Sequence, residues 1–451
     1  MASSPVRKPA PILSQSRVLR LLTLLLFYFT QGFPIGLFAY AIPAWMAAGG
    51  ATTGEIATIV SATALPWTLK LANGFIIDRY TFLPMGRRRV WIVGAQTLLV
   101  GVLVAGALAS PQPDEILLLA GIAFIANVAV TFQDVGIDSL AVDIMEEDER
   151  ARAGGIMFGS QIIGIAATTA VAGALLEAFG IGPALFVAAL VPAAVALFGA
   201  SIREREGERR LPWTAGTSHP HNLAIQVEAW WPLLANAARA VLLPLSLVLL
   251  PILLFRALPA GAFESFHPQL FQNGAGWALS EYTNFISSVG FVTGLFGLVV
   301  GGWLVDAVGS QRSVRIAVVA GVILLAAMGF ASTYWTQSWL LMGFVILFDI
   351  CGLMFAIGMI PICMRMCDPA TAATQFTIYM AIGNFGRPLG AALAANTAGA
   401  GSPEWLYWSI AIAWALIAAI LFAVRFPESA REGVAKVQVE PLGIGLHPLE
   451  D

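Results

Sequence analysis

Long, uninterrupted runs of apolar residues dominate the chain, and most charged residues lie in the short segments between them. A helix crosses the hydrocarbon core of a bilayer with roughly 20 apolar residues, which these runs supply. A transmembrane β-barrel would instead show alternating polar and apolar residues, and these runs do not alternate. The pattern predicts an all-α membrane protein with twelve transmembrane helices, near residues 19–46, 54–77, 90–109, 116–140, 153–176, 182–200, 243–271, 282–304, 314–332, 338–363, 371–397 and 405–424.

Composition supports a membrane protein and excludes several other classes. Of 451 residues, 58% are hydrophobic and 11% are charged, far from the balance of a soluble domain. The net charge of −3 and the lack of a long basic run exclude a nucleic-acid-binding protein. The three cysteines, Cys351, Cys363 and Cys367, lie in apolar surroundings, where they are expected to be packing residues rather than a disulfide framework.

The distribution of basic residues predicts the orientation in the membrane. The tails and alternate loops hold 21 of the 24 Lys and Arg residues, whereas the other loops hold acidic residues such as Glu55 and Glu177. The positive-inside rule therefore places both termini in the cytoplasm and requires an even number of spans. The first apolar run is too long for a secretory signal and is expected to be a retained helix. The Ala-, Gly- and Arg-rich composition favours a bacterial source, so the expected location is the cytoplasmic (inner) membrane of a bacterium.

An internal repeat relates the two halves of the chain. At a spacing of 225 residues, Pro34 pairs with Pro259 and Gly36 with Gly261, and three further identities follow within sixteen positions. Two six-helix bundles in parallel repetition are the natural inference, with a cavity between them. Residues 222–238 of the connector suit either a helix on the membrane surface or a disordered linker. The expected organisation is a cytoplasmic tail, a bundle, a connector, a second bundle and a second tail, at 1–18, 19–200, 201–242, 243–424 and 425–451.

Several motifs resemble those of a known transporter family. Gly74-Phe-Ile-Ile-Asp78-Arg79, followed by Gly86-Arg87-Arg88-Arg89, resembles the signature between the second and third helices of the major facilitator superfamily. The motifs Gln31-Gly32-Phe33-Pro34, Leu65-Pro66-Trp67-x-Leu69-Lys70, Gln133-Asp134-x-x-x-Asp138 and Gly386-Arg387 resemble the branch of muropeptide permeases and acetyl-CoA transporters, which also includes siderophore permeases. The resemblance implies the major facilitator fold and transport of a small solute, with a muropeptide as the first guess and a siderophore or an acyl-CoA as alternatives.

Ionisable side chains within the spans are the first candidates for function, because each costs roughly 3 kcal/mol or more to insert. In the first half, Asp134 and Asp138 lie four residues apart and share one helix face, at about the depth of Lys70. We expect Lys70 to pair with one or both carboxylates, either as part of the transport cycle or as a latch between helices that never contacts the solute. The seven such residues are Lys70, Asp134, Asp138, Arg256, Glu264, Asp349 and Arg387.

The basic residues of the second half are candidates for solute binding. Arg256 occupies the position of Gln31 in the repeat, near the midplane, where such transporters bind their solute. A guanidinium offers a bidentate fork to a carboxylate or phosphate, so Arg256 and Arg387 are expected to hold an anionic group. Alternatively, they neutralise Asp349 and Glu264. Further polar side chains expected to face the cavity are Gln31, Tyr379 and Asn384; these side chains could equally be ordinary packing contacts between helices.

Three cations against four carboxylates leave one acid unpaired, as a proton carrier requires. Glu264 is the first candidate for this role and Asp349 the second. His267, three residues after Glu264, either shares the proton or is a hydrogen-bonded structural histidine.

A charge cluster is expected at the cytoplasmic helix ends. Asp78 and Arg79, together with Arg87 and Arg88, would hold this side of the protein shut in one state. Asp306 and Arg312 would form a weaker counterpart in the second half. The alternative is that these arginines serve only the positive-inside bias.

The sequence therefore predicts a secondary active transporter that imports an anionic solute, such as a muropeptide, together with protons. A siderophore or an acyl-CoA is the alternative cargo, and a membrane-embedded acyltransferase or a transporter-like sensor is the alternative class. The chain lacks the nucleotide-binding, Gly-x-Ser-x-Gly and His-Glu-x-x-His motifs, so no enzyme activity, cofactor or metal is expected. The expected partners are the solute, protons and the bilayer, and the expected state is a monomer.

Overall fold

The computed structural model describes residues 11–145, 150–224, 244–366 and 372–426, together with residues 231, 232, 235, 238, 239 and 242. This part of the chain is helical, apart from an isolated β-bridge between Ile12 and Arg203. The long helices of the first half are α1 (Arg17–Ile35), continued by η2 (Gly36–Ala41) and α2 (Ile42–Ala48), then α3 (Thr53–Arg79), α4 (Arg89–Ala109), α5 (Ile116–Ile144), α6 (Arg150–Phe179) and α7 (Ile181–Ser201).

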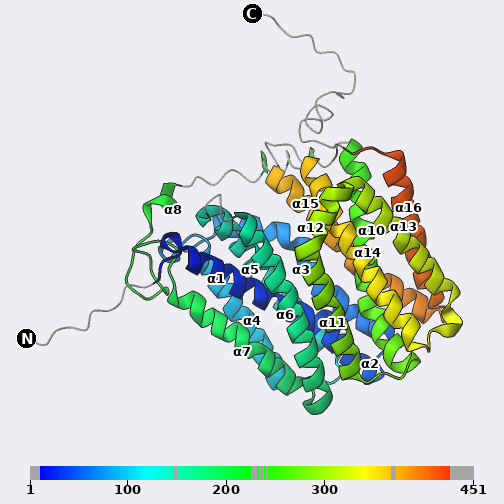
Figure 1. Cartoon of the computed structure of the whole chain (residues 1–451). Coiled ribbons are helices and arrows are strands. Elements are labelled where there is room, and N and C mark those ends of the chain that lie inside the picture. Colours follow the sequence, from blue (N-terminus) through cyan, green and yellow to red (C-terminus); the bar gives the residue numbers. More distant parts are fainter. Residues whose placement is uncertain are drawn as a thin grey trace, which may run out of the picture.

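The second half repeats this series of long helices. After the short α8 (Pro220–Ala224) come α10 (Pro244–Gln269) with η5 (Leu270–Gly274), α11 (Leu279–Phe296) with η6 (Gly297–Gly301) and α12 (Gly302–Val308), α13 (Ser310–Phe330), α14 (Ser338–Arg365), α15 (Ala372–Gly399) and α16 (Glu404–Ala423). Among the described residues, therefore, each half contributes six helical rods, and Figure 1 shows the two groups side by side. The predicted residue boundaries of the domains stay predictions.

Corresponding helices have corresponding neighbours in the two halves. The first rod of each half packs on the fifth, as α1 on α6 and α10 on α15. The third packs on the sixth, as α4 on α7 and α13 on α16. The halves meet chiefly where α3 lies against α15 and α6 against α11. The second and fifth rods therefore form the boundary between the two bundles.

Ten of the described helices have both the length and the hydropathy that a membrane crossing requires. The predicted spans at 54–77 and 371–397 correspond to α3 and α15, which do not reach this hydropathy although they have 27 and 28 residues. Both lie at the boundary between the bundles and carry polar side chains there, such as Lys70 and Arg387. Because these polar side chains face the interior of the protein rather than lipid, the lower hydropathy of α3 and α15 is expected.

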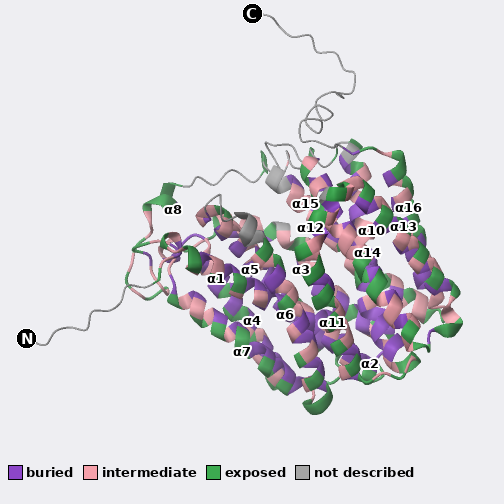
Figure 2. Cartoon of the chain, in the orientation of Figure 1, coloured by how far each residue is buried: buried purple, intermediate pink, exposed green. Residues whose placement is uncertain are grey.

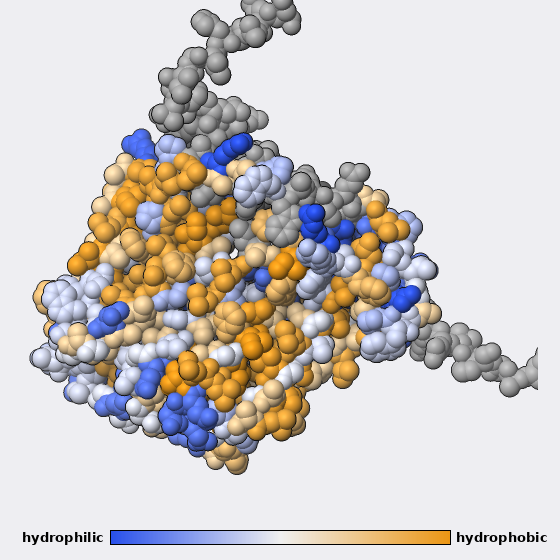
Figure 3. Space-filling model, turned by 180° about the vertical axis from the view of Figure 1, so that it is seen from behind, coloured by the Kyte–Doolittle hydropathy of each residue, from blue (hydrophilic) through white to orange (hydrophobic). Residues whose placement is uncertain are grey.

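The outer surface of the helices is apolar. Leu108, Leu117 and Phe330 are each about four-fifths exposed, an arrangement that water would oppose and lipid favours. Figure 2 shows exposed residues along the outward helix faces, and Figure 3 shows large contiguous hydrophobic areas on the face seen from behind. The chain is therefore a multi-pass membrane protein.

The two ends of the bundle differ in how the halves are joined. We call the end that carries α8 and residues 202–216 the connector end, and the opposite one the far end. Near the far end, Thr53 and Ala51 hydrogen-bond to Gln269, and the Gln272 amide donates to the Ala44 carbonyl at 2.8 Å. These contacts close the far end between the bundles.

At the connector end, the first part of the connector is folded against the first bundle. The Glu204 carboxylate accepts the backbone N–H groups of Arg87, Arg88 and Arg89 at 3.1–3.3 Å and so caps the start of α4. Glu208 accepts the Arg205 N–H and the Asn222 side-chain amide, each at 2.8 Å. Residues 204–222 therefore belong structurally to the first bundle, whereas most of the predicted surface helix at 222–238 lies outside the described residues.

Candidate solute-binding site

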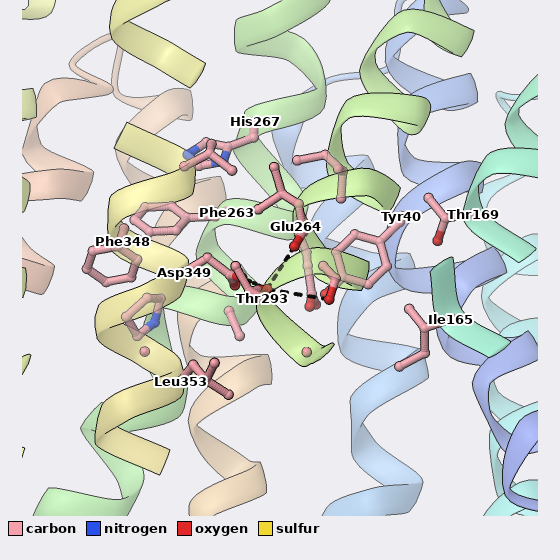
Figure 4. Close-up of a pocket in the computed structure, with 18 of the residues that line it drawn as sticks. Tyr40, Ile165, Thr169, Phe263, Glu264, His267, Thr293, Phe348, Asp349 and Leu353 are labelled. Atoms are coloured by element: carbon pink, nitrogen blue, oxygen red, sulfur yellow. Dashed lines mark hydrogen bonds between the residues drawn. The ribbon is translucent and has the colours of Figure 1, made fainter. Parts of the chain in front are cut away.

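A cavity of about 500 Å³ lies between the two bundles, chiefly against the second. The first bundle contributes Tyr40 from η2, and Ile165 and Thr169 from α6. The second bundle contributes the charged and aromatic side chains from α10, α11, α14, α15 and α16. Figure 4 shows Tyr40 and Thr169 on one side, and Phe263, Phe348 and Asp349 on the other. The volume is in the range of sites for solutes of drug-like size.

An ion pair between Glu264 of α10 and Arg387 of α15 lies in this cavity. Glu264 is only 5% exposed, and Arg387 Nη2 donates to its Oε1 atom. Within the described residues, Glu264 Oε2 and Arg387 Nε are buried without a hydrogen-bond partner, so the pair uses one of the two contacts that a guanidinium and a carboxylate can make. Figure 4 shows the Tyr40 ring directed toward Glu264 from the first bundle. A second acceptor or donor can therefore still bind to this pair.

Close packing of glycines places the two partners. A Cβ atom on Gly261, one helical turn before Glu264, would lie 1.9 Å from the Arg387 carbonyl oxygen. On α15, a Cβ on Gly390 would lie 1.9 Å from the Leu258 carbonyl oxygen. Only glycine permits this approach of the two backbones, and it brings the Arg387 side chain within reach of Glu264.

Arg256 and Asp349 line the same cavity without forming an ion pair. Across the residues that the structure describes, no carboxylate lies within salt-bridge distance of Arg256, which is partly exposed to the cavity. Asp349 accepts a hydrogen bond from the Thr293 hydroxyl at 2.5 Å, and within the same residues no cation pairs with it. Arg387 therefore neutralises Glu264, as the alternative reading of the sequence expected. Arg256 does not neutralise Asp349 in the described part of the chain.

Aromatic rings form one wall of the cavity. Phe348 lies 5.4 Å from Phe263, 5.3 Å from Phe344 and 5.0 Å from Trp414, measured between ring centroids. His267 is buried, stacks on Phe263 at 4.4 Å and has its Nε2 atom 3.1 Å from the Tyr407 hydroxyl. This is the geometry of the structural-histidine alternative, and a role in proton transfer stays a prediction.

The three predicted polar contacts occupy different places. Asn384 lines the cavity and donates to the Trp67 carbonyl oxygen of the first bundle at 3.3 Å. Gln31 and Tyr379 are fully buried and are not among the lining residues. Gln31 accepts from the Gln161 amide at 3.0 Å. The structure thus supports a cavity position for Asn384 and gives none to Gln31 or Tyr379, whose part in solute binding stays a prediction.

The charges of the first bundle lie outside the cavity lining. Lys70 Nζ lies 2.9 Å from Asp134 Oδ2, whereas Asp138 hydrogen-bonds to the Tyr28 hydroxyl and is not ion-paired with Lys70. The lysine therefore pairs with the first of the two predicted carboxylates. This separation from the cavity fits the alternative of a latch between α3 and α5.

At the connector end, Arg88 pairs with Asp78 at 2.5 Å, and Arg87 donates to the Asp78 carbonyl oxygen at 3.3 Å. Arg79 is exposed at the end of α3. These contacts lie within the first bundle. Arg312 is exposed, and the Asp306 side chain lies outside what the structure describes, so the counterpart in the second half stays a prediction.

Tyr40, Thr293 and the aromatic wall are the lining residues that sequence reasoning missed. Hydroxyl and aromatic side chains are common in membrane helices and carry no insertion penalty that would single them out. One signal was available for Tyr40, because it aligns with Ser265 in the repeat, one residue from Glu264.

Two helical bundles around a charged central cavity define a polytopic transporter. The model of the Major Facilitator Superfamily matches residues 24–390 and 284–449, and the chain belongs to this superfamily. The resemblance expected from the motifs is thereby confirmed.

Similar proteins include transporters of several solutes. An anhydromuropeptide permease of Escherichia coli (strain K12) is 22% identical over 384 residues, covering 81% of this chain and 71% of the relative. A folate-biopterin transporter of Synechocystis sp. (strain PCC 6803) is 23% identical over 379 residues, covering 81% and 72%. Among solved structures, a point mutant of the nucleoside transporter NupG has a TM-score of 0.68 at 15% identity, covering 90% of this chain and 99% of that chain. At this identity the likeness to NupG shows the fold alone.

Proposed function

We propose that the chain is a proton-coupled secondary transporter that imports an anionic solute, with an anhydromuropeptide as the first candidate. The observation that carries this proposal is the cavity in which Arg256 has no carboxylate partner among the described residues and Arg387 makes a single contact with Glu264. In bacterial cells the protein would lie in the inner membrane with the connector end facing the cytoplasm, as the basic loops predict.

Coupling follows from competition for Arg387. A solute carboxylate that binds to the Arg387 guanidinium displaces the Glu264 carboxylate from it. Glu264 would then be a buried anion without a cation, which is unfavourable, so it takes up a proton from the water in the cavity. When the solute leaves, Arg387 pairs with Glu264 again and the proton is released to the same side. Solute and proton therefore cross together.

The charge balance of the cavity favours the transport of one proton with each monoanionic solute. Arg256, Arg387, Glu264 and Asp349 have formal charges that sum to zero in the empty cavity. A solute with one net negative charge together with one proton restores zero. Because net charge is costly in a cavity between lipid-embedded bundles, we expect one proton to enter with each solute that carries one net negative charge.

A pteridine is the second candidate cargo. The wall formed by Phe263, Phe344, Phe348 and Trp414 can stack on a flat ring system, and one similar protein is named a folate-biopterin transporter. A muropeptide, which carries sugar rings and a peptide, would use the same wall through its apolar ring faces. Siderophores and acyl-CoA remain alternatives from the motif resemblance.

Uptake into proteoliposomes tests the proposal. The purified protein is reconstituted, an inside-alkaline pH gradient is imposed, and uptake of labelled anhydromuropeptide, folate, a ferric siderophore and acetyl-CoA is compared. We expect saturable, gradient-driven uptake of one class, lost in Arg387→Ala and in Arg256→Ala and retained in Asp114→Asn, which lies in an exposed far-end loop. Uptake that is indifferent to the gradient, or unchanged in both arginine variants, would refute the proposal.

A further inference from the structure

Asp349 is a carboxylate that the protein leaves open to the cavity. It is exposed on the cavity side of α14, and the Thr293 hydroxyl is its hydrogen-bond donor among the described residues. A carboxylate has about four acceptor positions, so most of its capacity is unused. Figure 4 shows Asp349 and Thr293 together at the centre of the lining, next to Phe348 and Phe263.

Asp349 and Arg256 lie at different depths. Phe348 precedes Asp349 and contacts Phe263, which precedes Glu264, at 5.4 Å between ring centroids, so Asp349 lies near the level of Glu264 in the cavity. Arg256 precedes Glu264 by eight residues on α10, which corresponds to about 12 Å toward the connector end. The cavity thus offers an open anion near the level of Glu264 and an open cation whose backbone position lies about 12 Å from that of Glu264 along the helix axis.

Neither charge has a partner of opposite sign within the described part of the chain, and both line the path of the solute. An ionised group between lipid-embedded helices needs water or a partner, and a solute that fills the cavity removes the water. The bound solute must therefore supply both partners, an acceptor for Arg256 and a donor for Asp349.

We infer that Asp349 is a specificity residue that binds an amino group or another N–H donor of the solute. This inference rests on the proposed function and narrows its substrate class: the preferred solute carries an anionic group and an N–H donor on separate parts of the molecule, joined by a ring system that packs on the aromatic wall. Solutes that are only anionic leave Asp349 without a donor and bind more weakly. Asp349 is then part of the binding site rather than the carrier of the transported proton.

A matched pair of probes tests this assignment. The first is an anhydromuropeptide whose peptide ends in diaminopimelate with a free side-chain amine, and the second is the same compound with that amine acetylated. Affinities are measured by the thermal shift of the purified protein in detergent, for the wild type, Asp349→Asn and Glu264→Gln. The wild type is expected to prefer the free amine by about ten- to a hundredfold, the usual effect of one hydrogen bond to a charged group. Asp349→Asn is expected to bind both probes within about twofold.

The remaining outcomes separate a specificity role from the alternatives. Glu264→Gln is expected to keep the preference for the free amine, and the control Asp114→Asn, in the exposed far-end loop, is expected to keep both this preference and proton-driven uptake. Equal wild-type affinity for the two probes, or loss of proton coupling in Asp349→Asn with the amine preference intact, would overturn the inference. Failure of the wild type to bind either probe would refute the proposed muropeptide cargo itself and this inference with it.

Discussion

At the scale of single residues, the Glu264–Arg387 ion pair is the group most suited to change partners during transport. Its single N–O contact leaves Glu264 Oε2 and Arg387 Nε unsatisfied in a buried site. Buried polar groups usually find partners, so two unsatisfied atoms in one pair favour a function that supplies them in turn. A solute anion that replaces Glu264 would supply the missing partner to the Arg387 guanidinium.

Replacing Glu264 by Gln should uncouple transport from the proton gradient. Gln mimics the protonated acid and cannot release a proton, so Arg387 remains available to the solute. We expect Glu264→Gln to exchange labelled for unlabelled solute across the membrane at a rate near that of the wild type, while gradient-driven accumulation is lost. Counterflow and accumulation assays in proteoliposomes measure both quantities. Accumulation equal to that of the wild type would show that another group carries the proton.

Glu208 should make the docking of the connector depend on pH. Burial raises the pKa of Glu208 from 4.5 to about 7, and the neighbouring Glu204 contributes in the same direction. Between these values the folded protein holds a proton that the unfolded chain has released, so the free energy of unfolding falls as pH rises from about 4.5 to about 7, by about 3 kcal/mol in full. Above pH 7 this contribution is lost and the dependence is flat.

The difference in melting temperature between the wild type and Glu208→Gln, measured from pH 4.5 to pH 8, checks this dependence. Gln keeps the acceptor for the Arg205 N–H but does not titrate, so the wild type should lose stability relative to the variant as pH rises. Glu206→Gln, which changes an exposed carboxylate on the same segment, serves as the control and should follow the wild type. Parallel curves for the wild type and Glu208→Gln would contradict the assignment.

At the scale of helices, glycine contacts determine which side chains meet. Gly32 and Gly164 bring α1 and α6 together, as Gly261 and Gly390 bring α10 and α15 together in the other half. Equivalent rods thus use the same device in both bundles. In the second bundle this contact places Arg387 beside Glu264, so the site depends on helix packing as much as on its charged residues.

Gly390→Ala should therefore destabilise the protein and impair uptake. The added Cβ would lie 1.9 Å from the Leu258 carbonyl oxygen, so the helices must separate, at a cost of about 1–3 kcal/mol. Gly399→Ala on the same helix is the matched control, because its Cβ would meet no atom within 4 Å. Melting temperature in detergent and uptake in proteoliposomes measure the effect. Equal stability of the two variants would show that α10 and α15 are not closely packed here.

Sequence reasoning located the charged residues of the site because insertion into lipid penalises each of them. It recovered Arg256, Glu264, Asp349 and Arg387, which all line one cavity. It could not determine which way Gln31 and Tyr379 point. In a helix whose lipid-facing and buried sides are both apolar, periodicity carries little information on orientation, and both residues lie buried between helices. The extents of the long helices were largely predictable from the apolar runs. The π-helical turns η2, η5 and η6 were not, because they do not interrupt those runs.

At the scale of the whole molecule, the proposed mechanism makes this structure one state of an alternating-access cycle. Hydrogen bonds from Gln269 and Gln272 to the first bundle join the halves at the far end. In the proposed mechanism, access to the cavity from the far end requires these contacts to break. The docked segment 204–222 remains with the first bundle, so the rest of the connector has to accommodate the motion.

A disulfide at the far end should therefore block transport reversibly. Thr53→Cys combined with Gln269→Cys, in a background where the native cysteines are replaced, places two thiols at residues whose side chains are in contact. Oxidation is expected to abolish uptake and reduction to restore it, with each single variant unaffected by oxidant. Unchanged uptake by the fully cross-linked protein would show that the far end does not open.

The central claim is that binding of an anionic solute makes Glu264 take up a proton. Proton uptake can be measured directly when saturating solute is added to purified protein in weakly buffered detergent solution containing a pH indicator. We expect about one proton per bound monoanionic solute for the wild type and none for Glu264→Gln. Saturating binding to the wild type without proton uptake would contradict the account.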